Sequence, residues 1–346
     1  MTILDTTVRD GSYAVDFKFS CNDVQDLVGK SERIGIEYIE IGHGLGLNAS
    51  GPGHGISLQT DVEYMRAARQ TAKKAKLGFF CIPDIARLED IELAAKNDMN
   101  FIRIGVPVQI WEKALPYIHK GREEGLEVFI NFMKTYAAPP AEFGEAAKNA
   151  FSAGAQVAYI VDSAGNMITD DIDRYIEATR NASEIKIGFH GHNNLGLAVS
   201  NTLHCVQKGV DFIDCTFQGL GRSIGNASLE QVVMALEIIG CSTGYDIPRV
   251  LEYGYSGLRN IVRRDLVNPL DYMCGFSGFH SSFLRDIYHC CMEKNIDPLR
   301  LILAYSKENK LTMDYSRLCE IADTLPRDPD ENPYNFGKYF SEIYND

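Results

Sequence analysis

The chain has 346 residues, of which 45% are hydrophobic, 23% charged and 10% aromatic. This balance is typical of a globular protein with a large buried core, and it excludes collagen, coiled coil and disorder. Lys and Arg total 34 against 47 Asp and Glu, so the formal net charge is −13. Such an acidic balance argues against a nucleic-acid-binding surface, but it allows a small anionic substrate held by one local cation or metal.

Nothing in the sequence predicts a membrane segment or a secretion signal. No stretch approaches the roughly 20 apolar residues that span a bilayer. The first residues carry charges and lack the apolar region of a signal peptide. The nine cysteines are scattered without a C-x-x-C pair, which indicates reduced thiols. We therefore expect a cytoplasmic protein.

Short β-branched or aromatic runs alternate with helix-length segments along the first 244 residues. The predicted strands are residues 2–4, 38–41, 78–82, 101–106, 128–133, 157–161, 185–189 and 212–217. The predicted helices are residues 22–33, 61–74, 87–96, 110–123, 141–153, 170–179, 195–207 and 229–239, with Asn22 able to cap the first. Eight such units with continuously apolar strands favour a (β/α)8 TIM barrel, with a doubly wound open sheet as the alternative.

The remaining hundred residues differ in composition from the barrel region. Residues 245–325 are rich in Leu, Tyr and Cys and predict a helical C-terminal domain, and residues 326–346 form a tail that begins with Pro and Asp. We therefore divide the chain into a barrel domain of residues 1–244, a helical extension and a tail.

Candidate catalytic groups are expected where the barrel strands end. His190 and His192 follow the seventh strand and are two residues apart, so in an extended chain both side chains point to one side. Asp10 follows the first strand, which neighbours the seventh closely enough to supply a third metal ligand. Two imidazoles and a carboxylate suit a divalent cation that also binds substrate oxygens. Arg9 beside them suits a developing enolate oxygen or a substrate carboxylate.

Two glycine-rich loops add further candidates. In residues 219–226, the glycines bring backbone N–H groups close to a ligand, and Asn226 either caps the next helix or reaches the surroundings of the metal. The loop of residues 42–55 could move over the barrel mouth. His43 in that loop is a candidate acid or base, or a loop histidine with structural contacts only.

These motifs resemble one known family. Arg9-Asp10-Gly11, His190-Gly191-His192-Asn193 and the glycines before Asn226 resemble those of the DRE-TIM metallolyases, which include HMG-CoA lyase, isopropylmalate and homocitrate synthases and 4-hydroxy-2-oxovalerate aldolase. The aldolases are most similar. They share the loop from His43 to Leu47, the strand end Val161-Asp162-Ser163 and the segment of residues 278–285.

The resemblance implies a lyase with a Mn²⁺ or Mg²⁺ ion on Asp10, His190 and His192. A 2-oxo acid such as pyruvate would chelate the ion, Arg9 would stabilise the enolate oxygen, and Ser163 would line the pyruvate pocket. The substrates would be a small 2-oxo acid and an aldehyde. The aldolases also imply an acylating aldehyde dehydrogenase as a candidate partner, with a homo-oligomer as the other assembly to consider.

Two positions depart from the aldolase pattern. Tyr13 occupies the place of a histidine that is the acid/base candidate, and His280 occupies the place of a tyrosine from the C-terminal domain. The two changes are consistent with an exchange of roles. A phenol normally titrates near 10 and an imidazole near 6.5, so His280 would be the better base at neutral pH. Independent changes with a different substrate are the alternative.

We therefore predict a metal-dependent class II aldolase that cleaves or forms a C–C bond in a 4-hydroxy-2-oxo acid. A Claisen-type synthase that joins an acyl-CoA to a 2-oxo acid is the first alternative. The synthases usually carry Glu-Gln soon after Arg-Asp-Gly, where this chain has Ser12-Tyr13. The second alternative is a non-catalytic subunit whose helical domain docks a partner.

Overall fold

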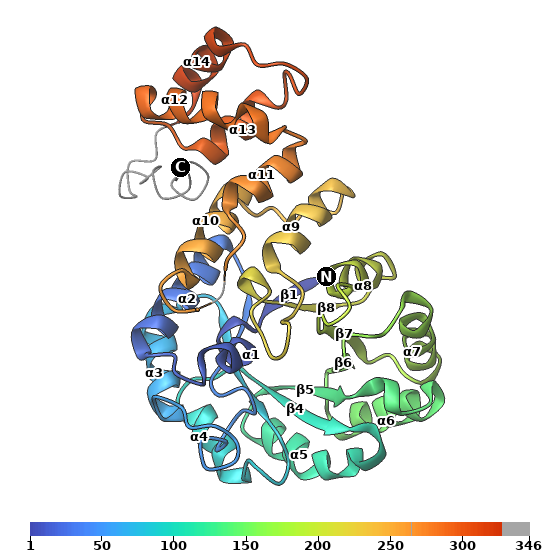
Figure 1. Cartoon of the computed structure of the whole chain (residues 1–346). Coiled ribbons are helices and arrows are strands. Elements are labelled where there is room, and N and C mark those ends of the chain that lie inside the picture. The colour runs from blue at the N-terminus through green and yellow to red at the C-terminus, as the bar shows by residue number, and fades with distance from the viewer. Residues whose placement is uncertain (264, 327–346) are drawn as a thin grey trace. The chain divides into compact units, whose positions relative to one another are not determined.

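Eight parallel strands close into a barrel in the order β1 to β8 (Figure 1). The computed structural model describes residues 1–263 and 265–326. Closure is complete because β1 pairs with both β2 and β8, in a register that sets Thr2 beside Phe212. The predicted (β/α)8 barrel is thus confirmed, and the open sheet is wrong. The strands are β1 Thr2–Asp5, β2 Tyr38–Ile41, β3 Lys76–Cys81, β4 Phe101–Pro107, β5 Glu127–Met133, β6 Val157–Asp162, β7 Lys186–Gly191 and β8 Phe212–Cys215.

Helices follow the strands and cover the outside of the barrel (Figure 1). They are α2 Cys21–Ile34, α3 Asp61–Thr71, α4 Leu88–Lys96, α5 Leu115–Glu123, α6 Pro140–Ala153, α7 Thr169–Ala182 and α8 Ala198–Gln207. After β8 comes α9 Leu229–Ile238, most of which belongs to the second compact unit described below. The predicted cap of the first long helix is wrong. Ser20, not Asn22, accepts the hydrogen bond from the Asp23 N–H, and Asp23 reciprocates by accepting from the Ser20 N–H.

Two local elements differ from the sequence prediction. A short helix α1, Thr7–Gly11, and a 3₁₀ turn η1, Ser12–Val15, follow β1 where no helix is predicted. The predicted helix over residues 110–123 is divided into a 3₁₀ segment η2, Val108–Ala114, and α5. The backbone of Ile110 is non-helical, and Pro116 stands in the first turn of α5, where a missing N–H costs nothing.

The C-terminal part is helical, as expected. Its helices are α10 Ile247–Leu258, α11 Pro269–Ser277, α12 Leu284–Lys294, α13 Pro298–Tyr305 and α14 Tyr315–Thr324. The described residues fall into two compact units, one of residues 1–232 and 257–263, the other of residues 233–256 and 265–326. The boundary at 244 stays a prediction, and all but the first residue of the predicted tail lies outside the described residues. Among the described residues, no helix has both the length and the apolar character needed to cross a membrane.

Aromatic rings fill the lower part of the barrel interior, at the amino ends of the strands. Tyr38, Phe101, Phe129 and Phe212 come from four different strands, and the centroids of neighbouring rings lie 5.3–5.9 Å apart. Gly78 on β3 makes room for them, because a Cβ there would lie 2.4 Å from the Phe101 ring. This packed layer closes the barrel from below and leaves its other end for polar groups.

Candidate metal and 2-oxo acid site

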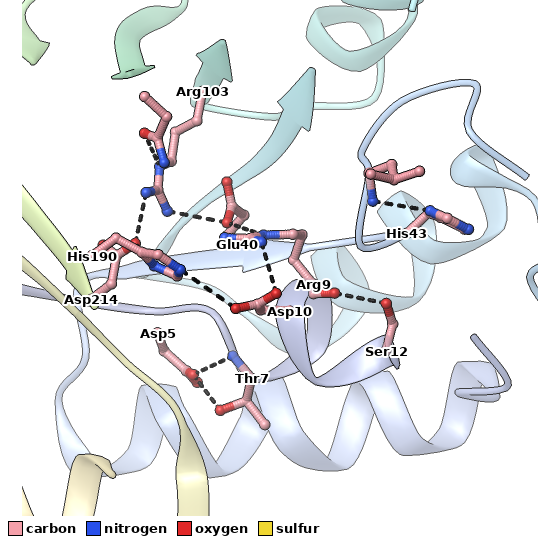
Figure 2. Close-up of polar contacts among 12 residues, drawn as sticks. Asp5, Thr7, Arg9, Asp10, Ser12, Glu40, His43, Arg103, His190 and Asp214 are labelled. Atoms are coloured by element: carbon pink, nitrogen blue, oxygen red, sulfur yellow. Dashed lines mark hydrogen bonds and ion pairs between the residues drawn. The ribbon is translucent and has the colours of Figure 1, made fainter. Parts of the chain in front are cut away.

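The short helix α1 places Arg9 and Asp10 at the carboxyl end of the barrel. Asp5, the last residue of β1, accepts hydrogen bonds from the N–H and hydroxyl of Thr7, which fixes the turn into α1 (Figure 2). The Thr7 hydroxyl in turn accepts a hydrogen bond of 2.9 Å from the Phe217 N–H after β8. The segment after β1 is therefore anchored to the segment that follows β8, the strand that neighbours β1.

Asp10, His190 and His192 come together as predicted. The Nε2 atom of His190 lies 3.5 Å from an Asp10 carboxylate oxygen, and the two imidazole rings are 5.1 Å apart and nearly perpendicular. All three side chains are buried, and one potential ligand atom from each lies within 4.8 Å of the others. Two imidazoles and one carboxylate at this spacing form a candidate site for a divalent cation.

The donor set fits a metal ion because polar atoms there lack other partners. Nδ1 of His192 and Oδ1 of Asn226 are buried and have no hydrogen-bond partner among the described residues. Asn226 donates from Nδ2 to Asp10 over 2.5 Å. The Asn226 side chain thus lies beside Asp10, where the second of the two roles considered for it would place it. Gly221 has no room for a Cβ because the Asn226 amide would lie 2.6 Å from it.

Electrostatics keep these ligands in the forms that bind a cation. Burial disfavours ionisation of Asp10, but the charges of Arg9 and the two histidines outweigh it and lower the pKa of the carboxyl to about 2. Burial lowers the pKa of His192 to about 4, so its imidazole is neutral at physiological pH. A carboxylate and a neutral imidazole are the protonation states that metal binding requires.

Asp214 orients His190. The Nδ1–H of His190 donates to Asp214 over 2.8 Å, which leaves Nε2 directed toward Asp10 (Figure 2). Arg103, fully buried on β4, donates to the same Asp214 oxygen over 2.6 Å. Burial disfavours the charge of Asp214, but Arg103 and His190 outweigh it and lower the pKa of the carboxyl. A carboxylate behind a ligating histidine fixes its ring and its tautomer.

The same arginine also supports Arg9 through Glu40. Arg103 donates to Glu40 over 3.1 Å, and the Nε–H of Arg9 donates to that same carboxylate oxygen over 2.6 Å. A second nitrogen of Arg9 lies 3.1 Å from Asp10. The Arg9 guanidinium is thus held between two carboxylates, with its carbon 4.9 Å from the centroid of the Phe80 ring.

Sequence reasoning missed Glu40, Arg103 and Asp214. Each stands two residues after an aromatic residue that faces the barrel interior, in a strand otherwise made of apolar residues. Because side chains two apart in a strand share a face, a charged residue at that position also faces inward. This signal was present, but the pairing of the three residues follows only from closure of the barrel.

A cavity of about 370 Å³ opens beside the cluster, and Arg9, Asp10, His190 and His192 line it. Tyr13 and Ser163 also line it, and their roles toward a substrate stay predictions. Burial raises the pKa of the Tyr13 phenol, which is therefore protonated at neutral pH.

Two other candidates have different surroundings. His43 is not among the residues that line the cavity. It stacks on Phe17 with ring centroids 4.2 Å apart, accepts from the Leu45 N–H over 3.0 Å, and directs its other ring nitrogen to the Gly55 carbonyl at 3.3 Å. These contacts order the loop of residues 42–55. His280 belongs to the second compact unit, where its ring is exposed and bonds to Ser282.

A sequence profile of the HMGL-like family matches residues 1–254. The chain belongs to the HMGL-like family. This agrees with the resemblance to DRE-TIM metallolyases. Among relatives of this HMGL-like chain, oxaloacetate decarboxylase of Mycobacterium tuberculosis is 39% identical over 280 residues, which cover 81% of this chain and 83% of that protein.

Aldolases match over more of the length. The 4-hydroxy-2-oxovalerate aldolase of Carboxydothermus hydrogenoformans is 34% identical over 326 residues, covering 94% of this chain and 97% of that protein. The solved HMG-CoA lyase of Brucella melitensis is 20% identical, with a TM-score of 0.66 over 76% of this chain and 99% of that one. At that identity the structural likeness supports the fold alone.

Proposed function

We propose that this HMGL-like chain is a metal-dependent carbon–carbon lyase that cleaves a 4-hydroxy-2-oxo acid and releases the enolate of pyruvate. One observation carries the proposal: the candidate metal ligands Asp10, His190 and His192 line the same cavity as Arg9. Such a site can accumulate negative charge on a substrate oxygen, which is the main requirement for making an enolate. The aldolase relatives match nearly the whole chain, which supports the same reaction.

Asp10, His190 and His192 would hold the cation, which we propose to be Mn²⁺ or Mg²⁺. When bound, the ion would polarise the carbonyl of the 2-oxo acid and lower the cost of forming the enolate. Asn226, which donates to Asp10, would keep that carboxylate in place beside the ion.

Arg9 is proposed to bind the oxygen on which the enolate charge develops. Its guanidinium is buried and held by Glu40 at 2.6 Å, so it keeps its position when substrate enters. A fixed cation that needs no reorientation stabilises a developing charge better than a mobile one. Ser163 lines the same cavity, and we assign it to the pyruvate portion of the substrate.

Cleavage requires the C4 hydroxyl to lose a proton. The C3–C4 bond then breaks, its electron pair passes into the enolate, and C3 finally takes up a proton to give pyruvate. Tyr13 lines the cavity as a protonated phenol, which suits it to donate a hydrogen bond or a proton rather than to act as base. The assignment of His280 as base stays a prediction.

Oxaloacetate decarboxylation is a second candidate, favoured by the 39% identity to a protein of that name. Loss of CO₂ from oxaloacetate gives the same enolate, and it requires no proton to leave a hydroxyl. The site residues assigned above would serve both reactions. No comparison favours the Claisen-type synthase or the non-catalytic subunit. An aldehyde dehydrogenase partner and a homo-oligomer stay predictions about how the chain assembles.

The test is a panel of substrates offered to the protein loaded with Mn²⁺ or Mg²⁺. The panel holds 4-hydroxy-2-oxo acids, oxaloacetate, and 2-oxo acids with acetyl-CoA, and mass spectrometry follows pyruvate, aldehyde and free CoA. We expect pyruvate and an aldehyde from at least one 4-hydroxy-2-oxo acid, with loss of turnover after chelation. Pyruvate from oxaloacetate alone would establish the second candidate, and CoA release would establish the synthase.

A further inference from the structure

Three cationic side chains line the cavity at two different depths. Arg9 is buried beside the metal cluster, whereas Lys134 and Arg222 are exposed. Asp10 is the only carboxylate among the described residues that line the cavity. In a chain of net charge −13, this is a local excess of positive charge. Arg9 and the metal cluster account for one anionic group of a substrate, and the two outer cations remain to be explained.

The backbone fixes the position of Lys134. It follows β5, and its N–H donates to the Ser163 hydroxyl, another lining group, over 2.9 Å. Lys134 itself has a left-handed backbone with φ of 56°, an uncommon conformation for a residue other than glycine. Its exposed side chain thus starts from a backbone position tied to the proposed pyruvate pocket.

Arg222 reaches the cavity from the loop after β8. Its guanidinium carbon lies 5.2 Å from the centroid of the Tyr13 ring, within the range of a cation–π contact. Among the described residues, neither Arg222 nor Lys134 forms an ion pair with a carboxylate, although many other cations of the chain do. Two cations without counter-ions in one cavity can bind an anion without first breaking an ion pair.

We propose that Lys134 and Arg222 form a second anion subsite, which binds a carboxylate beyond the bond that is cleaved. The substrate would then be a 4-hydroxy-2-oxo diacid, so that the aldehyde fragment carries its own negative charge. The cavity of about 370 Å³ has the size of a small-molecule site. This inference rests on the proposed aldolase reaction, and it adds the chemical class of the second product.

The placement of the cations favours an aldol substrate over oxaloacetate. In a decarboxylation the distal carboxylate is the group that becomes neutral CO₂. Cations bound to it stabilise the starting charge more than the transition state and so oppose the reaction. In an aldol cleavage the distal carboxylate keeps its charge throughout, and the same cations bind substrate and aldehyde product alike.

A matched pair of substrates tests the subsite. The monoacid 4-hydroxy-2-oxovalerate and the diacid 4-hydroxy-2-oxoglutarate differ only by a methyl group in place of a carboxylate. With the metal-loaded protein and pyruvate measured by mass spectrometry, we expect kcat/KM to be at least about tenfold higher for the diacid. Equal values, or a preference for the monoacid, would overturn the subsite.

Variants test whether Lys134 and Arg222 cause the preference for the diacid. The double substitution Lys134→Met with Arg222→Met should reduce the ratio of the two kcat/KM values to about one. The single substitution Arg222→Lys keeps the charge, so it should retain most of the wild-type ratio of the two kcat/KM values. Lys148→Met, an exposed substitution in α6 away from the cavity, should keep the wild-type ratio. A double variant that slows both substrates equally would contradict the proposal.

A binding measurement separates failure of the subsite from failure of the reaction. Neither 2-oxoglutarate nor 2-oxovalerate has a 4-hydroxyl group to support aldol cleavage, yet they differ by the same carboxylate. Calorimetry should give at least about tenfold tighter binding of 2-oxoglutarate, lost in the double variant. If neither hydroxy acid is cleaved but this difference holds, the subsite stands and the proposed reaction fails. If the two acids bind equally, the subsite is wrong whatever the turnover.

Discussion

The barrel interior has two layers that differ sharply in chemistry although the same strands build them. The lower layer is aromatic and apolar, and the layer above it is ionic. On three strands the change takes place over two residues, from Tyr38 to Glu40, from Phe101 to Arg103 and from Phe212 to Asp214. Because residues two apart face the same side of a strand, each pair contributes one side chain to each layer.

The comparison separates stability from function. Burial of its rings mainly stabilises the lower layer, in which Tyr38 also donates a hydrogen bond to Glu127 and accepts one from Lys76. Charges in the upper layer lose hydration and are tolerated only because each has a partner of opposite charge. Glu40 and Asp214 of the upper layer contact Arg9 and His190, so this layer supports the proposed site, whereas the lower layer contributes to the stability of the barrel.

The largest effect should come from removing the charge of Asp10, the carboxylate among the three proposed metal ligands. Asp10→Asn leaves the shape of the side chain but weakens its binding to a cation. We expect turnover to fall by about 1,000-fold or more and metal content after dialysis to be lost. Asp16→Asn is the control, since it makes the same change at an exposed position whose left-handed backbone suits Asn. Undiminished turnover of Asp10→Asn would refute the ligand assignment.

Two substitutions that should lower the free energy of unfolding by similar amounts compare the two layers directly. Arg103→Met leaves Glu40 and Asp214 buried without their shared cation and should lower the free energy of unfolding by about 3–5 kcal/mol. Phe129→Ala, in the lower layer, should cost a similar 3–5 kcal/mol through the cavity it leaves.

Activity should distinguish the two variants. When each is assayed at low temperature, where it is still folded, Arg103→Met should lose metal affinity and kcat, whereas Phe129→Ala should keep both. Urea unfolding and calorimetric metal titration are the measurements. Equal kcat values for the two folded variants would mean that the ionic layer does not position the site.

Glu230 is a buried carboxylate without a cationic partner among the described residues, and its pKa differs accordingly from that of Asp214. It is fully buried in α9 and accepts hydrogen bonds from the Gln218 N–H and the Ser228 hydroxyl, but no ion pair of Glu230 is seen in the described part of the chain. Burial raises the pKa of its carboxyl to about 7. Between about pH 4.5 and 7 the folded state therefore keeps a proton that the unfolded state releases.

Stability should consequently fall as the pH rises through that window, by up to about 3 kcal/mol, and this contribution should be absent above it. Glu230→Gln should flatten this part of the profile of unfolding free energy against pH. The exposed substitution Glu177→Gln should leave the profile unchanged. A wild-type slope in Glu230→Gln would show that another group titrates there.

The sequence predicted the eight strands and the metal cluster because both depend on local patterns. Strands buried on both faces are apolar runs, and His190 and His192 stand two apart at the end of one such run. Helix α1 was missed because its five residues have no amphipathic period, and its turn depends on the Asp5 side chain. Arg103 was missed because its two carboxylate partners come from β2 and β8, and only barrel closure brings these together.

The smallest effect expected is the removal of one charge behind a ligand. Asp214→Asn keeps an oxygen near the His190 Nδ1–H but removes the negative charge that makes the imidazole a stronger ligand. Metal affinity should fall by about 10–100-fold, as for other carboxylates behind ligating histidines. Asp173→Asn is a matched control, because Asp173 accepts from the His204 ring over 2.7 Å in another carboxylate–histidine pair away from the cavity. If both variants bind the metal as tightly as the wild type, Asp214 serves only to neutralise Arg103, and the upper layer acts on the site through Arg9 alone.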